Sequence, residues 1–178
     1  MIRFQRITTA DTAPYAFMEK LLQTSFPAEE YRDLQALRNY TDNNPLFSNH
    51  VIWDDETMIG LITWWDFDTF CYAEHLAIDP SLRNGGYGSR TIRLLIETVK
   101  KPLILEVEMP DTDEAWRRIG FYQRQGFRLW DEVSYLQPPY RPGDSFLPMY
   151  LMGYGEIGPK DADRVKDRIY REVYGQQP

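Results

Sequence analysis

The sequence predicts a single α+β domain built on a mixed, mostly antiparallel sheet of six to seven strands flanked by helices. Three strand-like segments follow one another between residues 47 and 78, with turns so short that only antiparallel neighbours fit. Helix-like and strand-like segments then alternate from residue 88 to residue 152. We find no internal repeat, low-complexity segment or linker, so one domain accounts for the chain.

Length and composition fit such a domain. The chain has 178 residues, and 43% of them are hydrophobic, enough for a packed core. The 20 Lys and Arg residues against 27 Asp and Glu residues give a net charge of −7, which disfavours nucleic-acid binding. Aromatic residues make up 15%, which indicates either aromatic-rich packing or a pocket lined with rings.

Several classes of protein are disfavoured. The single cysteine, Cys71, allows neither an intramolecular disulfide nor an all-cysteine metal site, and two histidines are too few for a His-rich site, so we expect no metal. The longest apolar run, Met58–Trp65, is far shorter than a membrane span, and the N-terminus lacks an apolar signal region. We therefore expect a soluble cytoplasmic protein without a membrane partner.

The first half of the chain predicts one strand, two helices and a three-stranded meander. Residues 2–8 alternate between apolar and polar, as a half-buried strand does. Asp11 is a plausible cap for a helix that continues to about Leu22, and a polar helical stretch over residues 25–40 ends at Asn43-Asn44-Pro45. The meander consists of Phe47–Trp53, Thr57–Phe67 and Phe70–Ile78.

The second half predicts three helices and three strands. The helices are Gly88–Val99, Glu114–Gln125 and a weakly amphipathic one over Asp161–Tyr174, in which Val165, Ile169 and Val173 lie four apart. The strands are Leu103–Met109, Phe127–Tyr135 and Ser145–Met152. In the middle helix, Trp116, Ile119 and Tyr122 are expected on one apolar stripe, and Gly126 is expected to end it in a left-handed conformation.

The segment Leu76–Ser89, LAIDPSLRNGGYGS, carries the chemical signal. It predicts a strand, a loop with three glycines and the start of a helix. Amides at a helix N-terminus are unpaired donors with partial positive charge, and glycines let an anion approach closely. Together they predict a site for a phosphate or pyrophosphate, with Arg83 adding a charge.

Three other interpretations fit less well. A hairpin turn at Asn84-Gly85 conflicts with the helical period that follows it. A dinucleotide fingerprint would need a glycine where Thr91 stands, and a strand ending nearer to its first glycine. A P-loop would need Gly-Lys-Ser/Thr, which does not follow.

Three motifs in order resemble the GNAT family of N-acetyltransferases. The loop Arg83–Gly88, RNGGYG, matches the family's Arg/Gln-x-x-Gly-x-Gly/Ala pattern. It follows EHLAIDP, which is similar to the family's fourth strand, and leads to LILEVE, which is similar to the fifth. RRIGFYQRQGF, residues 117–127, resembles the helix-to-strand signature. The resemblance covers residues 1–155 as an acetyltransferase domain and leaves residues 156–178 as a C-terminal helical tail.

The resemblance implies acetyl-CoA as the co-substrate. Amides of the loop would hold its pyrophosphate, and the edge of a strand that splays from its neighbour would pair with the pantetheine arm. Carried onto this chain, the loop comprises Arg83, Asn84, Gly85, Gly86, Tyr87, Gly88 and Ser89, and the edge comprises Leu76, Ala77 and Ile78. An amide near Leu76 would stabilise the oxyanion.

Transfer to an amine also needs a base and an acid. The resemblance places the acid at Tyr122, whose alternative is a core aromatic. Strand alternation puts Glu74 on one face of its strand, and Glu106 with Glu108 on one face of the next. Glu74 and Glu106 are the candidate bases, with Glu108 behind them, and each has a solvated strand carboxylate as its alternative. His75 is expected to be structural.

One position departs from the family. Many members have Asn near the start of the helix that precedes the tyrosine, where this chain has Ala115. That contact with the cofactor is therefore not carried over. Arg118 is left with two interpretations, a contact to a CoA phosphate or a solvated charge.

The resemblance implies an N-acetyltransferase that acts by direct attack of a primary amine in a ternary complex. The acceptor, a small molecule or a peptide, would lie near residues 26–40 and 135–150, where Glu29, Glu30 and Asp33 would attract a cation. The alternative is a non-catalytic acyl-CoA sensor or protein-interaction module on the same fold. The C-terminal helix is expected to dock onto the domain or onto a second subunit in a homodimer.

Overall fold

The computed structural model describes residues 1–177, and its chain divides into two compact units. Unit 1 comprises Met1–Phe67 and Ala73–Lys100, and unit 2 comprises Asp68–Tyr72 and the chain from Lys101 onward. Strand β4 (Cys71–Ile78) contributes to both, because its first two residues belong to unit 2 and the remainder to unit 1. The described residues form five α-helices and eight strands in the order that the sequence predicts, apart from one strand that is split.

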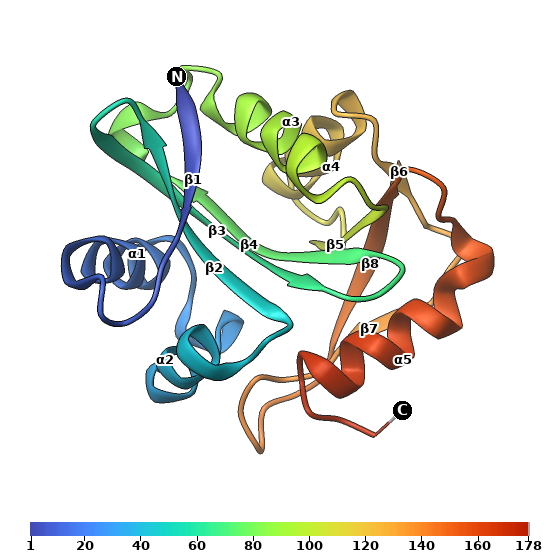
Figure 1. Ribbon diagram of the computed structural model, residues 1–178. Helices are drawn as coiled ribbons and strands as arrows, with labels where there is room; N and C mark the ends of the chain where they lie inside the picture. Colours follow the sequence, from blue (N-terminus) through green and yellow to red (C-terminus); the bar gives the residue numbers. More distant parts are fainter. Residues whose placement is uncertain (178) are drawn as a thin grey trace. The chain divides into compact units, whose positions relative to one another are not determined.

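Unit 1 is a sheet covered on both faces by helices. Its elements are β1 (Ile2–Arg6), α1 (Thr12–Ser25), α2 (Leu34–Asn43), β2 (Phe47–Asp54), β3 (Thr57–Asp66), most of β4, and α3 (Tyr87–Val99). Strands β1, β2 and β3 pair in antiparallel fashion, and β4 is the next strand of the sheet after β3, so the three strands of the predicted meander, β2, β3 and β4, lie side by side. Helices α1 and α2 lie on one face of these strands, and α3 lies on the other (Figure 1).

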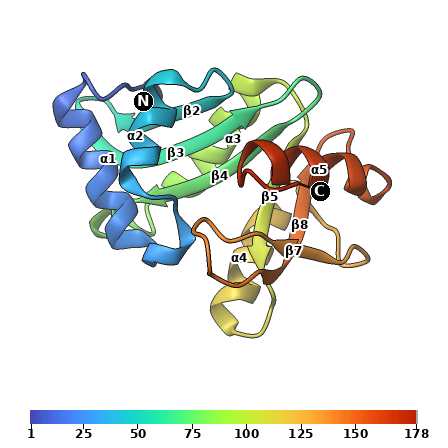
Figure 2. The same cartoon turned by 90° about the horizontal axis from the view of Figure 1, so that it is seen from below.

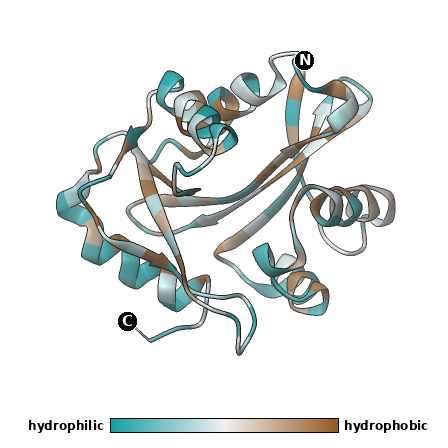
Figure 3. Cartoon of the chain, turned by 180° about the vertical axis from the view of Figure 1, so that it is seen from behind, coloured by the Kyte–Doolittle hydropathy of each residue, from teal (hydrophilic) through white to brown (hydrophobic). Residues whose placement is uncertain are grey.

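The long β3 strand is the centre of the unit 1 core. Seven successive residues, from Ile59 to Trp65, are buried, as expected for a strand with helices on both faces. The strands are largely hydrophobic when coloured by hydropathy (Figure 3). A Cβ on Gly60 would lie 2.5 Å from the Ala77 carbonyl oxygen, so β3 tolerates only glycine where β4 approaches.

Unit 2 is built around two long antiparallel strands. Its elements are the start of β4, β5 (Leu103–Glu108), α4 (Asp113–Arg124), β6 (Arg128–Leu129), β7 (Tyr135–Gln137), β8 (Leu147–Tyr154) and α5 (Ala162–Glu172). Strand β5 pairs with β4 in parallel, at Cys71↔Leu103 and Tyr72↔Ile104, and with β8 in antiparallel fashion. Helices α4 and α5 lie on opposite sides of β5 and β8 (Figure 2). The predicted mixed α+β fold is confirmed.

The prediction of one continuous strand over Phe127–Tyr135 is wrong. The chain forms two short strands, β6 and β7, and both pair with β8. Between them, the N–H of Trp130 donates to the Leu151 carbonyl, and a turn follows in which the Val133 N–H returns to the Trp130 carbonyl. The Trp130 ring is buried beside Gly153, and the turn over the residues that follow it separates β6 from β7.

The predicted stripe on α4 is also partly wrong. Ile119 is fully buried, but Trp116 is 56% exposed. Ala115, one turn before Ile119, is buried in its place. The apolar face of α4 therefore follows an i, i+4 line, and the large size of Trp116 does not by itself place it inside.

Helix α5 docks onto unit 2 of its own chain. Val165, Ile169 and Val173, which the sequence places four apart, are all buried, and α5 is otherwise largely hydrophilic (Figure 3). The Tyr170 hydroxyl donates to the Leu136 carbonyl. The boundary between a domain at 1–155 and a tail at 156–178 stays a prediction, and Pro178 lies outside the described residues.

Two negative observations concern residues 1–177 alone. No helix within this range is both long and apolar enough to cross a lipid bilayer. The same residues contain no group of three or more His, Cys, Asp or Glu side chains arranged to hold a metal ion.

Candidate active site

The glycine loop, residues 83–89, joins β4 to α3 within unit 1. Asn84 has φ 72° and Gly86 has φ 71°, so two left-handed residues alternate just before the helix begins. A Cβ on Gly86 would meet no atom within 4 Å, so the space above this glycine is open. Alternating left-handed and right-handed residues at a helix N-terminus turn successive amides toward one side, a geometry that suits an anion.

The side chain of Tyr87, the first residue of α3, helps to hold this loop in place. Its hydroxyl donates to Asp54 Oδ2 at 3.0 Å, and the Arg90 guanidinium lies 4.3 Å from its ring centroid. A Cβ on Gly85 would lie 3.0 Å from the same ring, so a larger residue there would have to displace the Tyr87 side chain slightly. Arg83 is exposed, as expected for a charge at the mouth of a site.

The β4 segment Leu76–Ile78 precedes the loop, with a short 3₁₀ turn, Pro80–Leu82, between them. The side chain of Ala77 is buried, and Leu76 and Ile78 are half-buried. Two residues earlier, Glu74 has a fully buried side chain although the residue as a whole is only half-buried. The exposure at Glu74 therefore comes from its main chain, which leaves backbone groups of β4 accessible to a ligand.

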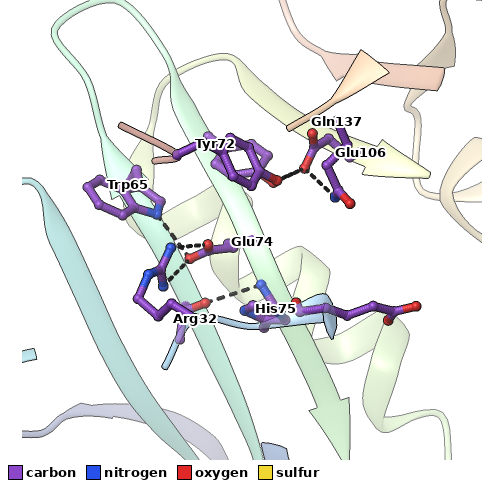
Figure 4. A network of polar contacts seen from close by, with 10 residues as sticks. Arg32, Trp65, Tyr72, Glu74, His75, Glu106 and Gln137 are labelled. Atoms are coloured by element: carbon purple, nitrogen blue, oxygen red, sulfur yellow. Dashed lines mark hydrogen bonds and ion pairs between the residues drawn. The ribbon is translucent and has the colours of Figure 1, made fainter. Parts of the chain in front are cut away.

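Glu74 forms a buried ion pair within unit 1. Arg32 donates through both guanidinium nitrogens, with Nη1 3.1 Å from Oε2, and the Trp65 indole Nε1 lies 3.0 Å from the same oxygen (Figure 4). The Arg32 and Glu74 side chains are 6% and 0% exposed. The guanidinium lies 5.1, 5.4 and 5.6 Å from the ring centroids of Tyr40, Phe47 and Trp65. Burial alone would raise the pKa of Glu74, but Arg32 lowers it below the ordinary value.

His75 is a packed residue of the same strand. Its Nε2 lies 2.8 Å from the Glu30 carbonyl oxygen (Figure 4), and its ring meets Phe26 edge-on at 4.9 Å. Burial lowers the pKa of His75, which favours the neutral ring. These contacts fit the structural role expected for His75.

Glu106, on β5 in unit 2, is held by neutral donors. Its Oε1 accepts hydrogen bonds from the hydroxyls of Tyr72 and Tyr174, the latter at 2.6 Å, and from Gln137 Nε2 at 3.2 Å (Figure 4). Its Oε2 accepts one from the Tyr135 hydroxyl at 2.5 Å. Burial raises the pKa of Glu106, and the hydrogen bonds oppose that rise without cancelling it. The result is a carboxyl group with raised proton affinity.

Glu108 and Arg118 are engaged with each other at the surface of unit 2. Arg118 Nη1 lies 3.1 Å from Glu108 Oε1, and its Nη2 lies 3.7 Å from Glu114 Oε1. Both members of the first pair are 44% exposed. This geometry favours a solvated ion pair for Glu108 over the role of a base.

Tyr122 lies on α4, which packs against β5. Its half-buried ring contacts Phe121 and Phe127 at centroid distances of 5.1 and 5.6 Å. Within residues 1–177, its hydroxyl has no hydrogen-bond partner and is not sealed from solvent. Burial raises the pKa of Tyr122, with Arg118 opposing, so the hydroxyl keeps its proton at neutral pH. This geometry suits a proton donor.

Sequence reasoning missed the partners of both buried carboxylates. Arg32 sits in a polar stretch of the chain without any motif, and Tyr174 lies in the tail. The one available signal was the alternation that puts Tyr72 on the same face of β4 as Glu74. The parallel register of β4 and β5, which gives Tyr72 to Glu106, is not readable from one sequence.

Comparison with known proteins identifies the family. The sequence model of the acetyltransferase (GNAT) family matches residues 15–127. A solved structure from Bacteroides thetaiotaomicron, described as a "putative acetyltransferase from GNAT family", is 53% identical and covers 98% of this chain and 99% of its own, with a TM-score of 0.96. The Bacillus subtilis (strain 168) "putative acetyltransferase YjbC" is 31% identical over 83 residues, 46% of this chain and 43% of that protein.

A more distant structure shows the same fold. A GNAT family acetyltransferase from Elizabethkingia anophelis, solved with acetyl-CoA bound, is 18% identical, with a TM-score of 0.59 over 86% of this chain and 97% of its own. The curated relative YjbC is matched over less than half its length, whereas the family model alone spans well over half of this chain. This chain belongs to the GNAT acetyltransferase family.

Proposed function

We propose that this protein transfers an acetyl group from acetyl-CoA to a primary amine by direct attack within a ternary complex. The observation that carries the proposal is the glycine loop at the N-terminus of α3, with Asn84 and Gly86 both left-handed and open space at Gly86. That loop lies inside the residues matched by the family. The cytoplasmic location expected from the sequence belongs to the same proposal.

The proposed cofactor site lies in unit 1. Amides of residues 83–89 bind the pyrophosphate of acetyl-CoA, with the exposed Arg83 as a counter-charge. The backbone of Leu76–Ile78 pairs with the pantetheine arm, and the accessible main chain of β4 supports this assignment. An amide near Leu76 stabilises the negative charge that develops on the carbonyl oxygen. The Elizabethkingia anophelis relative, which was solved with acetyl-CoA, supports this choice of donor.

The proposed proton-transfer groups lie in unit 2. The amine nitrogen attacks the thioester carbonyl, a C–N bond forms, and the C–S bond breaks. Glu106 takes the proton that the amine loses, and Tyr122 gives a proton to the departing thiolate. Glu106 is favoured over Glu74 because its pKa is raised, whereas the Glu74 carboxylate is neutralised by Arg32.

The acceptor is proposed only as a primary amine. Of the three acidic side chains expected to attract it, Asp33 instead accepts hydrogen bonds from the amides of Gln35 and Ala36 and caps α2. The hairpin between β7 and β8 remains the proposed wall of the acceptor site. Tyr140 from this hairpin packs against Tyr174 at 5.0 Å.

The first test is calorimetric titration of the full-length protein with acetyl-CoA, with NADH as the control ligand. Gly86→Glu puts bulk and negative charge into the glycine loop and should abolish binding. Gly143→Glu is the matched control, because Gly143 also has positive φ (91°) and open space but lies in unit 2. Acetyl-CoA binding that Gly86→Glu leaves intact would contradict the pyrophosphate site.

The second test separates an enzyme from a sensor. Wild-type protein with acetyl-CoA is incubated with a panel of primary amines, and released thiol is measured. Thiol release that depends on an amine supports the transferase. Tight binding with no release across the panel would favour the non-catalytic module instead.

A further inference from the structure

Most of the hydrogen-bond donors around Glu106 lie beyond the family-matched segment. The match ends at residue 127, whereas Tyr135, Gln137 and Tyr174 follow it. Tyr174 comes from the residues directly after α5, far from Glu106 along the chain. The C-terminal helix therefore reaches a carboxylate to which the proposed function gives a catalytic role.

Tyr174 is held in place by local structure rather than by the contact with Glu106 alone. The buried stripe of α5 fixes the helix, and Gly175 then turns the chain with φ 64°. The Gln176 N–H donates to the Tyr170 carbonyl at 2.8 Å, which closes that turn. The Tyr174 ring rests on Tyr140 at 5.0 Å. The hydroxyl thus meets Glu106 from a position set by several independent contacts.

The two carboxylate oxygens of Glu106 are used unequally. Oε1 accepts from Tyr72, Tyr174 and Gln137, whereas Oε2 accepts only from Tyr135. A carboxylate offers about four acceptor positions, two on each oxygen. Oε1, with three donors, has no acceptor position left, so the remaining acceptor position is on Oε2.

We propose that Tyr174 is a positioning residue for Glu106. Its hydroxyl, together with that of Tyr72, holds Oε1 and so fixes the carboxylate, and the acceptor position of Oε2 that Tyr135 does not use takes the proton. This inference rests on the proposed function for the role of Glu106 in the reaction, but the contact itself is independent of that function. It makes the C-terminal helix part of the catalytic apparatus and not only a stabilising appendage.

The titratable groups that donate to Glu106 are tyrosines from two strands and the tail. Tyr72 comes from β4, Tyr135 from β7 and Tyr174 from the segment after α5, and all three donate to it. Tyr170 interacts electrostatically with Glu106, and Tyr140 with Tyr135 and Tyr174. Burial and the Glu106 charge raise the pKa of Tyr135 and of Tyr174, so both remain protonated donors at neutral pH.

The direction of the expected effect follows from the charge state. A hydrogen bond to the ionised carboxylate favours that form, so loss of the Tyr174 hydroxyl raises the pKa of Glu106. A hydrogen bond to a charged group corresponds to about one pH unit. The Tyr174→Phe variant keeps the ring and its packing against Tyr140 but removes the donor.

The experiment is a ¹³C NMR titration of glutamate side-chain carboxyls in the full-length protein without acetyl-CoA. Glu106→Gln assigns the Glu106 resonance by its loss. In Tyr174→Phe, the midpoint of this resonance should move upward by about one pH unit. Tyr170→Phe is the matched control, because the Tyr170 hydroxyl lies on α5 but donates to the Leu136 carbonyl. In this variant the midpoint of the Glu106 resonance should not change.

The same variants then enter the acetyl-transfer assay. The assay uses an amine that the panel has identified as an acceptor. In Tyr174→Phe, the apparent pKa of the acid limb of the kcat/KM profile should rise together with the NMR midpoint of Glu106. An unchanged midpoint, or an equal shift in Tyr170→Phe, would overturn the positioning role. So would a shifted midpoint with an unmoved acid limb. Failure of the proposed function would appear differently, as no acetyl transfer by the wild type while the NMR shift persists.

Discussion

Each of the two units contains a carboxylate removed from solvent, and the two differ in what surrounds it. Glu74 in unit 1 meets the Arg32 guanidinium and the Trp65 indole. Glu106 in unit 2 meets three tyrosine hydroxyls and one amide, none of which carries a positive charge. The pKa of Glu74 is lowered by its cation, and the pKa of Glu106 is raised by burial.

Burial alone therefore does not give a carboxylate its role. A buried cation fixes Glu74 in the charged state, so it holds structure but binds a proton poorly. Neutral donors satisfy Glu106 without fixing its charge, so burial raises its pKa in the direction that favours a general base. Substitutions at the Glu74 site are expected to lower stability, and substitutions at the Glu106 site are expected to lower turnover. The two sites can therefore be tested against each other.

The largest expected effect on stability is at Arg32. Arg32→Met leaves the Glu74 charge buried without its cation, which should cost about 3–5 kcal/mol in urea unfolding. In Arg32→Met/Glu74→Gln, the charge is gone and an acceptor remains for the Trp65 indole. Most of the lost stability should return in this double variant. A loss below about 1 kcal/mol in the single variant would contradict the assignment of a buried ion pair.

In the other unit, Tyr122→Phe should lower kcat by about 10²–10⁴-fold, the usual contribution of a general acid. The affinity for acetyl-CoA in calorimetry should not change. Tyr154→Phe is the control, since Tyr154 also packs on Phe127, at 5.5 Å. Unchanged turnover in Tyr122→Phe would remove this hydroxyl from the mechanism.

The pH dependence of stability should have opposite signs at the two carboxylates. The folded pKa of Glu74 is lowered, so its contribution is present above the unfolded pKa and is lost as pH falls through the folded pKa. The folded pKa of Glu106 is raised, so its contribution is present below the unfolded pKa and is lost as pH rises through the folded pKa.

Urea unfolding across the acidic range measures both slopes. Glu74→Gln should flatten the loss of stability at low pH, and Glu106→Gln should flatten the decline toward neutral pH. Each carboxylate binds at most one proton, so its contribution to the slope of the unfolding free energy against pH cannot exceed about 1.4 kcal/mol per pH unit. Slopes of the same sign at the two sites would refute the comparison.

The smallest effect concerns the helix that follows Arg32. The Asp33 carboxylate accepts from the amides of Gln35 and Ala36 at 2.8 and 3.0 Å, so Asp33→Ala removes the cap of α2. The expected cost is about 1 kcal/mol, measured by thermal unfolding. Asp33→Asn retains a capping oxygen and should cost less. Equal costs would indicate that the negative charge matters more than the cap.

Much of the fold could be predicted because its elements have strong local signals. The meander over residues 47–78 followed from alternating strands and short turns, and α3 from its helical period after the glycine loop. The break between β6 and β7 was not predicted, because the turn that separates them, closed by the Val133 N–H and the Trp130 carbonyl, contains neither Gly nor Pro to signal it. The exposure of Trp116 likewise lacks a local signal, since size alone does not decide which side of a helix is covered.

The candidate site was predictable only in part, for the same reason. The loop of residues 83–89 carries its chemistry in consecutive residues, so one sequence suffices to place it. The surroundings of Glu74 and Glu106 come from residues separated by 9 to 68 positions from the glutamate that they contact. Only the folded structure brings these side chains together, and so only it distinguishes two glutamates that occupy similar places on neighbouring strands.

The most direct test compares the pH profiles of acetyl transfer in Glu106→Gln and Glu74→Gln at equal concentrations of folded protein. Glu106→Gln should lose the acid limb of kcat/KM and about 10²–10⁴-fold in kcat. Glu74→Gln should retain the limb and most of the turnover while unfolding more easily. The reverse pattern, with the limb lost in Glu74→Gln and kept in Glu106→Gln, would contradict the division of roles between the two carboxylates.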